Sequence, residues 1–89
     1  MHQLIVIDWV DSKGCSSSWD FIDDMQPMLP VQIRTVGFIE RNNKKYITVF
    51  QSYSNDQVVG RMTIPKCCVL KITKLKSPPN KLRNANTCA

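Results

Sequence analysis

Residues 58–75 constrain the fold most strongly, because they form a pattern of strand, tight break and second strand. Met62 and Ile64 alternate with Arg61 and Thr63, and a period of two is typical of a half-buried strand. A proline follows that lacks a backbone donor and suits the first turn of a helix. We therefore expect one helical turn over residues 65–68, since four residues are too few for a crossover.

Three further strands are predicted before this segment. Residues 3–10 are apolar on both faces over much of their length, which indicates a strand covered on both sides. Residues 31–41 alternate around Gly37, where we expect a bend or bulge. An asparagine-rich turn then leads into a third strand at residues 46–52. The fourth strand begins at residue 57 or 58, after a second turn.

A short helix is predicted in the long loop between the first two strands. One of the serines at residues 17–18 can cap it. The helix begins at Trp19 and ends at about Met25, with Ile22 on the same face as both. Two prolines make residues 26–30 an extended connector back to the sheet.

This order of elements predicts a mainly β protein, a five-stranded SH3-like or Sm-like barrel that occupies residues 1–75. Residues 76–89 hold two prolines, three asparagines and one large apolar residue. We expect these residues to form a disordered basic tail that the core activity does not need. A chain of 89 residues buries only about 60% of its unfolded surface, so we also expect a homo-oligomer.

Charge is distributed unevenly along the chain. Residues 1–30 hold one lysine against five aspartates, a net charge of −4, whereas residues 31–89 hold eleven lysines and arginines against two acids, a net charge of +9. No apolar run approaches the roughly 18 residues of a membrane span, so we expect a soluble protein without membrane contact. The four cysteines have no CxxC spacing and the only histidine is His2, so we expect reduced thiols and no metal.

Two groups of residues are candidate ligand contacts. Both tryptophans lie near polar residues of the long loop, and flat rings beside hydroxyls and carboxylates suit a nucleotide-like ligand or a partner's side chain. The alternative is that the first tryptophan fills the core and the second holds the helix against it. Basic residues of the later strands form the second group and can bind phosphate, unless they are merely solvated. The candidates are Trp9, Asp11, Ser12, Trp19, Arg34, Arg61, Thr63 and Lys66.

Nothing in the sequence supports catalysis or a cofactor, because the single histidine is at position 2 and there is no glycine-rich phosphate loop. We therefore expect a binding protein and no enzyme.

Several short motifs together resemble a loose group of small bacteriophage-encoded proteins. They are W-V-D-S at residues 9–12, Trp19, T-V-G-F at residues 35–38 and M-T-I-P-K at residues 62–66, followed by Ile72 and Leu75. The resemblance covers residues 5–75 and implies a phage origin and action in the host cell cytoplasm. Small non-enzymatic phage proteins often resemble host-directed inhibitors, such as anti-CRISPR proteins or sponges for nucleotide immune signals.

The resemblance therefore implies a protein that antagonises a host defence system, by sequestering a nucleotide-like anionic signal or by blocking a host immune protein. The alternative is a basic barrel that binds nucleic acid with an affinity that falls steeply with salt.

Overall fold

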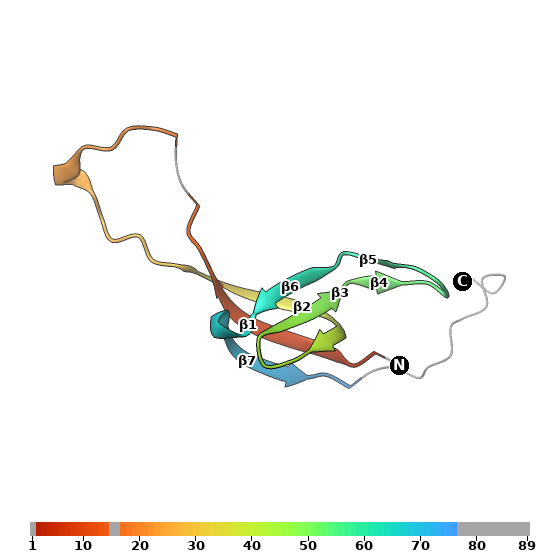
Figure 1. Cartoon of the computed structure of the whole chain (residues 1–89). Helices are drawn as coiled ribbons and strands as arrows, with labels where there is room; N and C mark the ends of the chain where they lie inside the picture. Colours follow the sequence, from red (N-terminus) through yellow and green to blue (C-terminus); the bar gives the residue numbers. More distant parts are fainter. Residues whose placement is uncertain (1, 15–16, 77–89) are drawn as a thin grey trace.

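The structure, a computed structural model, describes residues 2–14 and 17–76 and is mainly β. Five strands form one antiparallel sheet in the order β6-β3-β2-β1-β7 (Figure 1). A two-stranded ribbon, β4-β5, continues from the end of β3. The bounds are β1 Leu4–Asp11, β2 Val31–Asn42, β3 Tyr46–Phe50, β4 Ser52–Tyr53, β5 Val58–Val59, β6 Met62–Pro65 and β7 Val69–Lys74, with single 3-10 turns η1 Ile22–Asp24 and η2 Lys66–Cys68. The all-β class is confirmed, and so is the helical turn that joins the last two strands.

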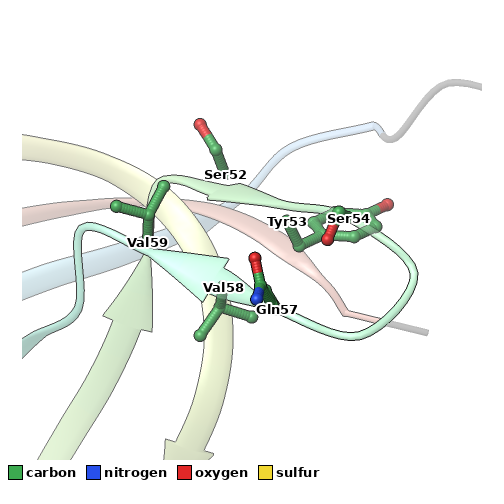
Figure 2. Close-up of a pocket in the computed structure, with 6 residues that line it drawn as sticks. All are labelled: Ser52, Tyr53, Ser54, Gln57, Val58 and Val59. Carbon is green, nitrogen blue, oxygen red and sulfur yellow. The ribbon is translucent and has the colours of Figure 1, made fainter.

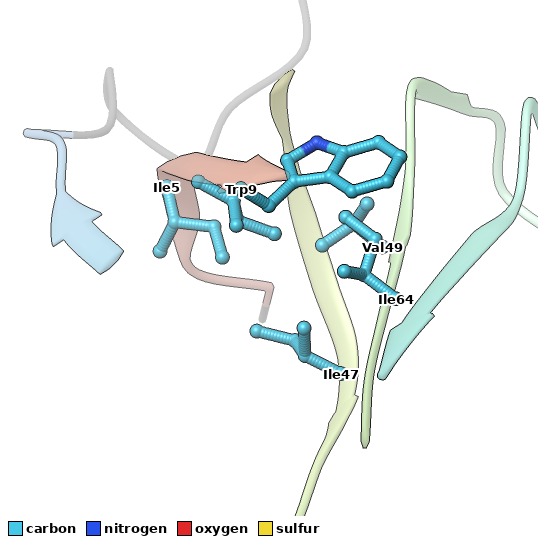
Figure 3. Packing of buried hydrophobic residues seen from close by; sticks show 6 residues of the cluster. Ile5, Trp9, Ile47, Val49 and Ile64 are labelled. Carbon is cyan, nitrogen blue, oxygen red and sulfur yellow. The ribbon is translucent and has the colours of Figure 1, made fainter. Parts of the chain in front are cut away.

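One face of the sheet carries the hydrophobic core. Alternation along β1 directs every second side chain to this face, where side chains from β1, β3 and β6 face one another (Figure 3). The buried residues are Ile5, Ile7, Trp9, Ile47, Val49 and Ile64, and Ile33, Ile39, Cys68, Val69 and Ile72 pack around them.

A second apolar cluster lies on the opposite side of β3. Phe50 is fully buried, and its ring stacks on Phe38 with centroids 5.6 Å apart. Tyr53 of the ribbon and His2 meet the same ring edge-on, at 5.9 Å and 4.7 Å. The sheet is thus covered on both faces at this end, and the ribbon supplies part of this cover through Tyr53.

The bulge of β2 does not lie at Gly37, where the sequence predicted a bend or bulge. Gly37 pairs regularly with Ile5, and the register of β2 with β3 shifts between Ile39 and Arg41 instead. Gly37 is required for a different reason, because a Cβ there would lie 3.1 Å from the Phe50 carbonyl oxygen. The bulge predicted at Gly37 therefore lies further along β2, between Ile39 and Arg41.

A second register shift changes the faces of β7. It lies where Asp8 and Trp9 of β1 pair with Lys71 and Val69, so Leu70 has no partner on β1. Strict alternation would place Val69 and Ile72 on opposite faces, yet both pack against the core. A bulge produces this outcome because it inserts one extra residue into the alternation.

The predicted third and fourth strands are each interrupted. Residues 46–52 divide into β3 and β4 at Gln51, and residues 57–64 divide into β5 and β6. Gly60 makes the second break with a φ of +75°, which disfavours residues with a side chain. At the β2–β3 turn the Asn43 side chain accepts hydrogen bonds from the backbone N–H groups of residues 45 and 46, both at 2.9 Å.

The predicted helix between β1 and β2 is wrong. We call residues 12–30, described except for 15–16, the arm; it projects away from the sheet and contains only the single turn η1 (Figure 1). Trp19 is 99% exposed and Ile22 80%, so the predicted apolar stripe is not packed against the sheet. A helix of about seven residues is marginal without such packing.

The predicted tail begins at Lys76, and the rest of it, residues 77–89, lies outside the described residues. Cys15 and Cys88 lie outside them as well. No helix formed by residues 2–14 and 17–76 has the length and apolar character needed to span a membrane.

Candidate functional site

An open pocket of about 290 Å³ lies where β1 and β2 run into the arm. Trp9 and Arg34 line this pocket, and Asp11 and Ser12 follow directly at the end of β1. Four of the eight predicted site residues therefore gather at the base of the arm. The lining residues are Asp8 and Trp9 from β1, Gln32, Ile33 and Arg34 from β2, and Leu70 from the bulge of β7.

Trp9 contributes an edge rather than a stacking surface. The residue is only 8% exposed and belongs to the buried core, and its Nε1–H donates to Thr35 Oγ1 at 2.9 Å. A ring packed in this way has no face or donor left for a ligand. Of the two roles that the sequence allowed for Trp9, stacking on a ligand or filling the core, the structure shows the second.

An ion pair forms the polar wall of the pocket. Arg34 Nε donates to Asp8 Oδ1 at 2.7 Å, and Nη2 lies 3.4 Å from Oδ2. This hydrogen bond lowers the pKa of Asp8 and raises that of Arg34. The Arg34 side chain remains 72% exposed and has five N–H donors, so it can also bind an incoming anion.

Lys71 places a second positive charge next to this wall. It pairs with Asp8 across the β1–β7 register, and its charge further lowers the pKa of Asp8. Two cations therefore lie beside one carboxylate at this edge of the pocket, and the lining itself pairs one acidic with one basic side chain, Asp8 and Arg34. A nearby apolar residue, Leu70, is 60% exposed. The arrangement suits an anionic group attached to an apolar one.

The end of β1 is closed by a local hydrogen bond, in which the Ser12 backbone N–H donates to Asp11 Oδ1 at 2.8 Å. The η2 turn lies close to Asp11, and the charge of Asp11 contributes to the raised pKa of Cys68 in this turn. The larger cause is a hydrogen bond with Cys67, whose Sγ lies 3.9 Å away. A raised pKa keeps the Cys68 thiol protonated at neutral pH, which makes it a poor nucleophile.

Arg61, which the sequence predicted as a phosphate ligand, lies outside this pocket in a second ion pair. Its Nε and Nη2 donate to the two carboxylate oxygens of Glu40, each at 2.7 Å. This bidentate pair lowers the pKa of Glu40 and raises that of Arg61. The pair joins β2 to the residue that precedes β6.

The other predicted residues do not converge either. The Thr63 hydroxyl shares a hydrogen bond of 2.8 Å with that of Thr48. The Lys66 backbone N–H, predicted to be free for an anion, donates to the Lys45 carbonyl at 2.8 Å. Trp19 is in the arm, almost fully exposed. The backbone N–H of Lys66 is therefore not free for an anion, and the phosphate contacts of the Arg61, Thr63 and Lys66 side chains stay a prediction.

A further pocket, of about 300 Å³, was missed by sequence reasoning. It lies on the β4–β5 ribbon (Figure 2), where the Ser54 backbone N–H donates to the Gln57 carbonyl at 2.8 Å. Its lining residues are Ser52, Tyr53, Ser54, Gln57, Val58 and Val59. They carry no formal charge, so this pocket has no means of selecting an anion. The only sequence signal for it was the turn at residues 53–56.

Within the part of the chain that the structure describes, no three His, Cys, Asp or Glu side chains are grouped to hold a metal ion. His2 Nδ1 lies 3.2 Å from the Ile39 carbonyl oxygen, beyond the opposite end of β1 from Asp8 and the pocket. Comparisons of the chain with protein-family models, with curated proteins and with solved structures found no match.

Proposed function

We propose that this chain is a non-enzymatic, phage-type binding protein that antagonises a host defence system in the host cytoplasm. The W-V-D-S, V-G-F and I-P-K motifs support the phage assignment. We further propose that its sheet is an SH3-like barrel. The support is that β1 pairs with both β2 and β7, while one 3-10 turn joins β6 directly to β7.

The pocket at the base of the arm is the proposed ligand site, and the exposed Arg34 guanidinium in its wall, with Lys71 beside it, is the observation that carries the proposal. Arg34 and Lys71 attract an anion, while Leu70 and the edge of Trp9 offer apolar contacts. A nucleotide combines a phosphate with a flat ring, so a nucleotide immune signal matches both parts. Sequestration needs only such binding and no chemical step.

Calorimetric titration of the full chain with a panel of cyclic dinucleotides, at two salt concentrations, tests this proposal. We expect one member to bind stoichiometrically and with little salt dependence. Arg34→Ala is expected to weaken its binding at least tenfold, because the exposed guanidinium is the main anion donor of the pocket.

The matched control is Lys44→Ala, which removes one positive charge from the β2–β3 turn, outside the pocket. Equal losses in both variants, or no binding of any nucleotide, would contradict the nucleotide site. Binding of a host immune protein that is lost in Arg34→Ala alone would instead assign the same pocket to an acidic side chain of that protein.

A second candidate function, nucleic-acid binding, is favoured by one further observation. The β2–β3 turn and η2 lie together, since Lys66 N–H donates to the Lys45 carbonyl at 2.8 Å. Arg41, Lys44, Lys45 and Lys66 are thereby concentrated at one end of the sheet. Binding of duplex DNA or RNA at this end is expected to weaken by about 0.9 log unit per log unit of salt for each phosphate neutralised. Lys44→Ala is then the damaging change and Arg34→Ala the neutral one.

A further inference from the structure

The arm exposes an unusual amount of apolar surface. Soluble monomers rarely expose contiguous apolar patches larger than a few hundred Å², yet the arm carries six large apolar side chains that are between 61% and 99% exposed. These side chains belong to Trp19, Phe21, Ile22, Met25, Met28 and Leu29. A surface of this kind needs a partner that covers it.

The arm is also acidic, which restricts the chemistry of that partner. Asp20, Asp23 and Asp24 are interspersed among its apolar residues, and no salt bridge neutralises them among the described residues. The partner surface must therefore be both apolar and basic.

This chain carries such a surface on the side of the sheet opposite the core. The register places Val6 opposite Val36, and Asp8 opposite both Arg34 and Lys71, so these side chains share one face. We call this the outer face. Val36 is 45% exposed, and the two cations are flanked by the exposed Leu70 of the adjoining pocket.

The arm does not cover the outer face of its own chain. It leaves the sheet after Asp11 and returns at Val31, which pair with each other at the end of the sheet, and it projects outward from there (Figure 1). A second copy of the chain is thus the partner whose charge and apolar surface both match.

We propose that two copies exchange arms, so that the arm of each lies across the outer face of the other. The aspartates of the arm then face Arg34 and Lys71, and its apolar side chains cover Val36 and Leu70. Such a pair is isologous, because each copy gives an arm and receives one, and every contact is made twice.

The area available is sufficient for a stable dimer. An aromatic side chain buries about 150–250 Å², so Trp19 and Phe21 of both copies alone bury roughly 600–1,000 Å². The four aliphatic and methionine side chains of each arm bring the total into the range of about 1,200–2,000 Å² that specific interfaces bury.

Arm exchange uses the same cations as the proposed ligand site, because Arg34 and Lys71 then face the aspartates of the arm. An anionic ligand therefore competes with the arm for these two side chains. This last step rests on the proposed function, whereas arm exchange itself does not.

Sedimentation equilibrium of the full chain between about 1 and 100 µM tests the exchange. The chain has a mass of 10.2 kDa, and we expect a dimer of about 20 kDa. The double variant Trp19→Ser/Phe21→Ser is expected to be a monomer with an unchanged sheet spectrum by circular dichroism, because neither side chain touches the core. Val59→Ser, at a residue 64% exposed on the ribbon, is the matched control and remains dimeric.

A mixing experiment tests the reciprocal contact directly. The double variant Arg34→Glu/Lys71→Glu has an intact arm but a repulsive outer face, so we expect it to be monomeric as well. Mixed with Trp19→Ser/Phe21→Ser, it forms a heterodimer, because one intact arm then meets one intact outer face.

Three results would overturn arm exchange: a 10-kDa wild-type monomer at every concentration, a dimer that survives loss of both aromatic residues, or arm amides protected from hydrogen exchange in a monomer. A dimer that binds no nucleotide would leave arm exchange intact and reject the proposed nucleotide site. Nucleotide binding by a wild-type monomer would support the nucleotide site and reject arm exchange.

Discussion

Replacement of Trp9 by phenylalanine separates a core role from a binding role for this residue. The change removes the hydrogen bond to Thr35 Oγ1, which contributes about 1 kcal/mol. It also removes roughly 40 Å² of buried ring, worth about 1 kcal/mol at 25 cal/mol per Å². We therefore expect the free energy of unfolding to fall by roughly 2 kcal/mol. For a domain of this size, the melting temperature then falls by roughly 8–16 °C.

Thermal and urea unfolding of Trp9→Phe, Thr35→Val and the double variant measure these contributions. If the hydrogen bond between Trp9 and Thr35 stabilises the fold by about 1 kcal/mol, the double-mutant cycle gives a coupling energy of the same size. A loss below about 0.5 kcal/mol in Trp9→Phe would refute the reasoning, since it would mean that the indole is not packed as an essential part of the core.

Three further predictions concern the backbone and the ion pairs. Gly37→Ala is expected to cost about 1–3 kcal/mol by urea unfolding, because its Cβ would meet the Phe50 carbonyl oxygen at 3.1 Å. Gly60→Ala is expected to cost about 2–3 kcal/mol in the same assay, because φ there is +75° and a Cβ would also lie 2.8 Å from Gln51 Cγ. The lowered pKa values of Asp8 and Glu40 mean that their ion pairs stabilise the fold fully above the ordinary carboxyl pKa of about 4 and less as the pH falls below it. Acid unfolding of Asp8→Asn, which is expected to show a shallower loss of stability below pH 4 than the wild type, checks this sign.

The strands could be predicted because they depend on local alternation. The run from Leu4 to Asp11 and the alternation that ends at Ile64 are both visible within a few residues, and the structure has strands at each. The break at residues 65–68 was equally local, since it follows from the missing donor of Pro65.

The arrangement across strands could not be predicted in the same way. Whether Arg61 binds a phosphate or Glu40 depends on a pairing between residues 21 positions apart. The bulge at Leu70 likewise depends on the register between β1 and β7, and the sequence fixes no register for residues so far apart. The prediction of a helix between β1 and β2 was wrong for a related reason. The spacing of Trp19 and Ile22 indicates an apolar face on a helix, but it does not indicate whether the sheet covers that face.

The site proposal is tested most directly by locating the ligand on the chain. We suggest a ¹⁵N–¹H NMR titration of the full chain with the cyclic dinucleotide that binds in calorimetry. The account predicts that the largest shifts occur at the amides of residues 8–12, 32–34 and 70–71 and at the Trp9 indole, while Lys44 and Gly60 stay in place. Shifts concentrated at the β2–β3 turn, or none around Arg34, would contradict it.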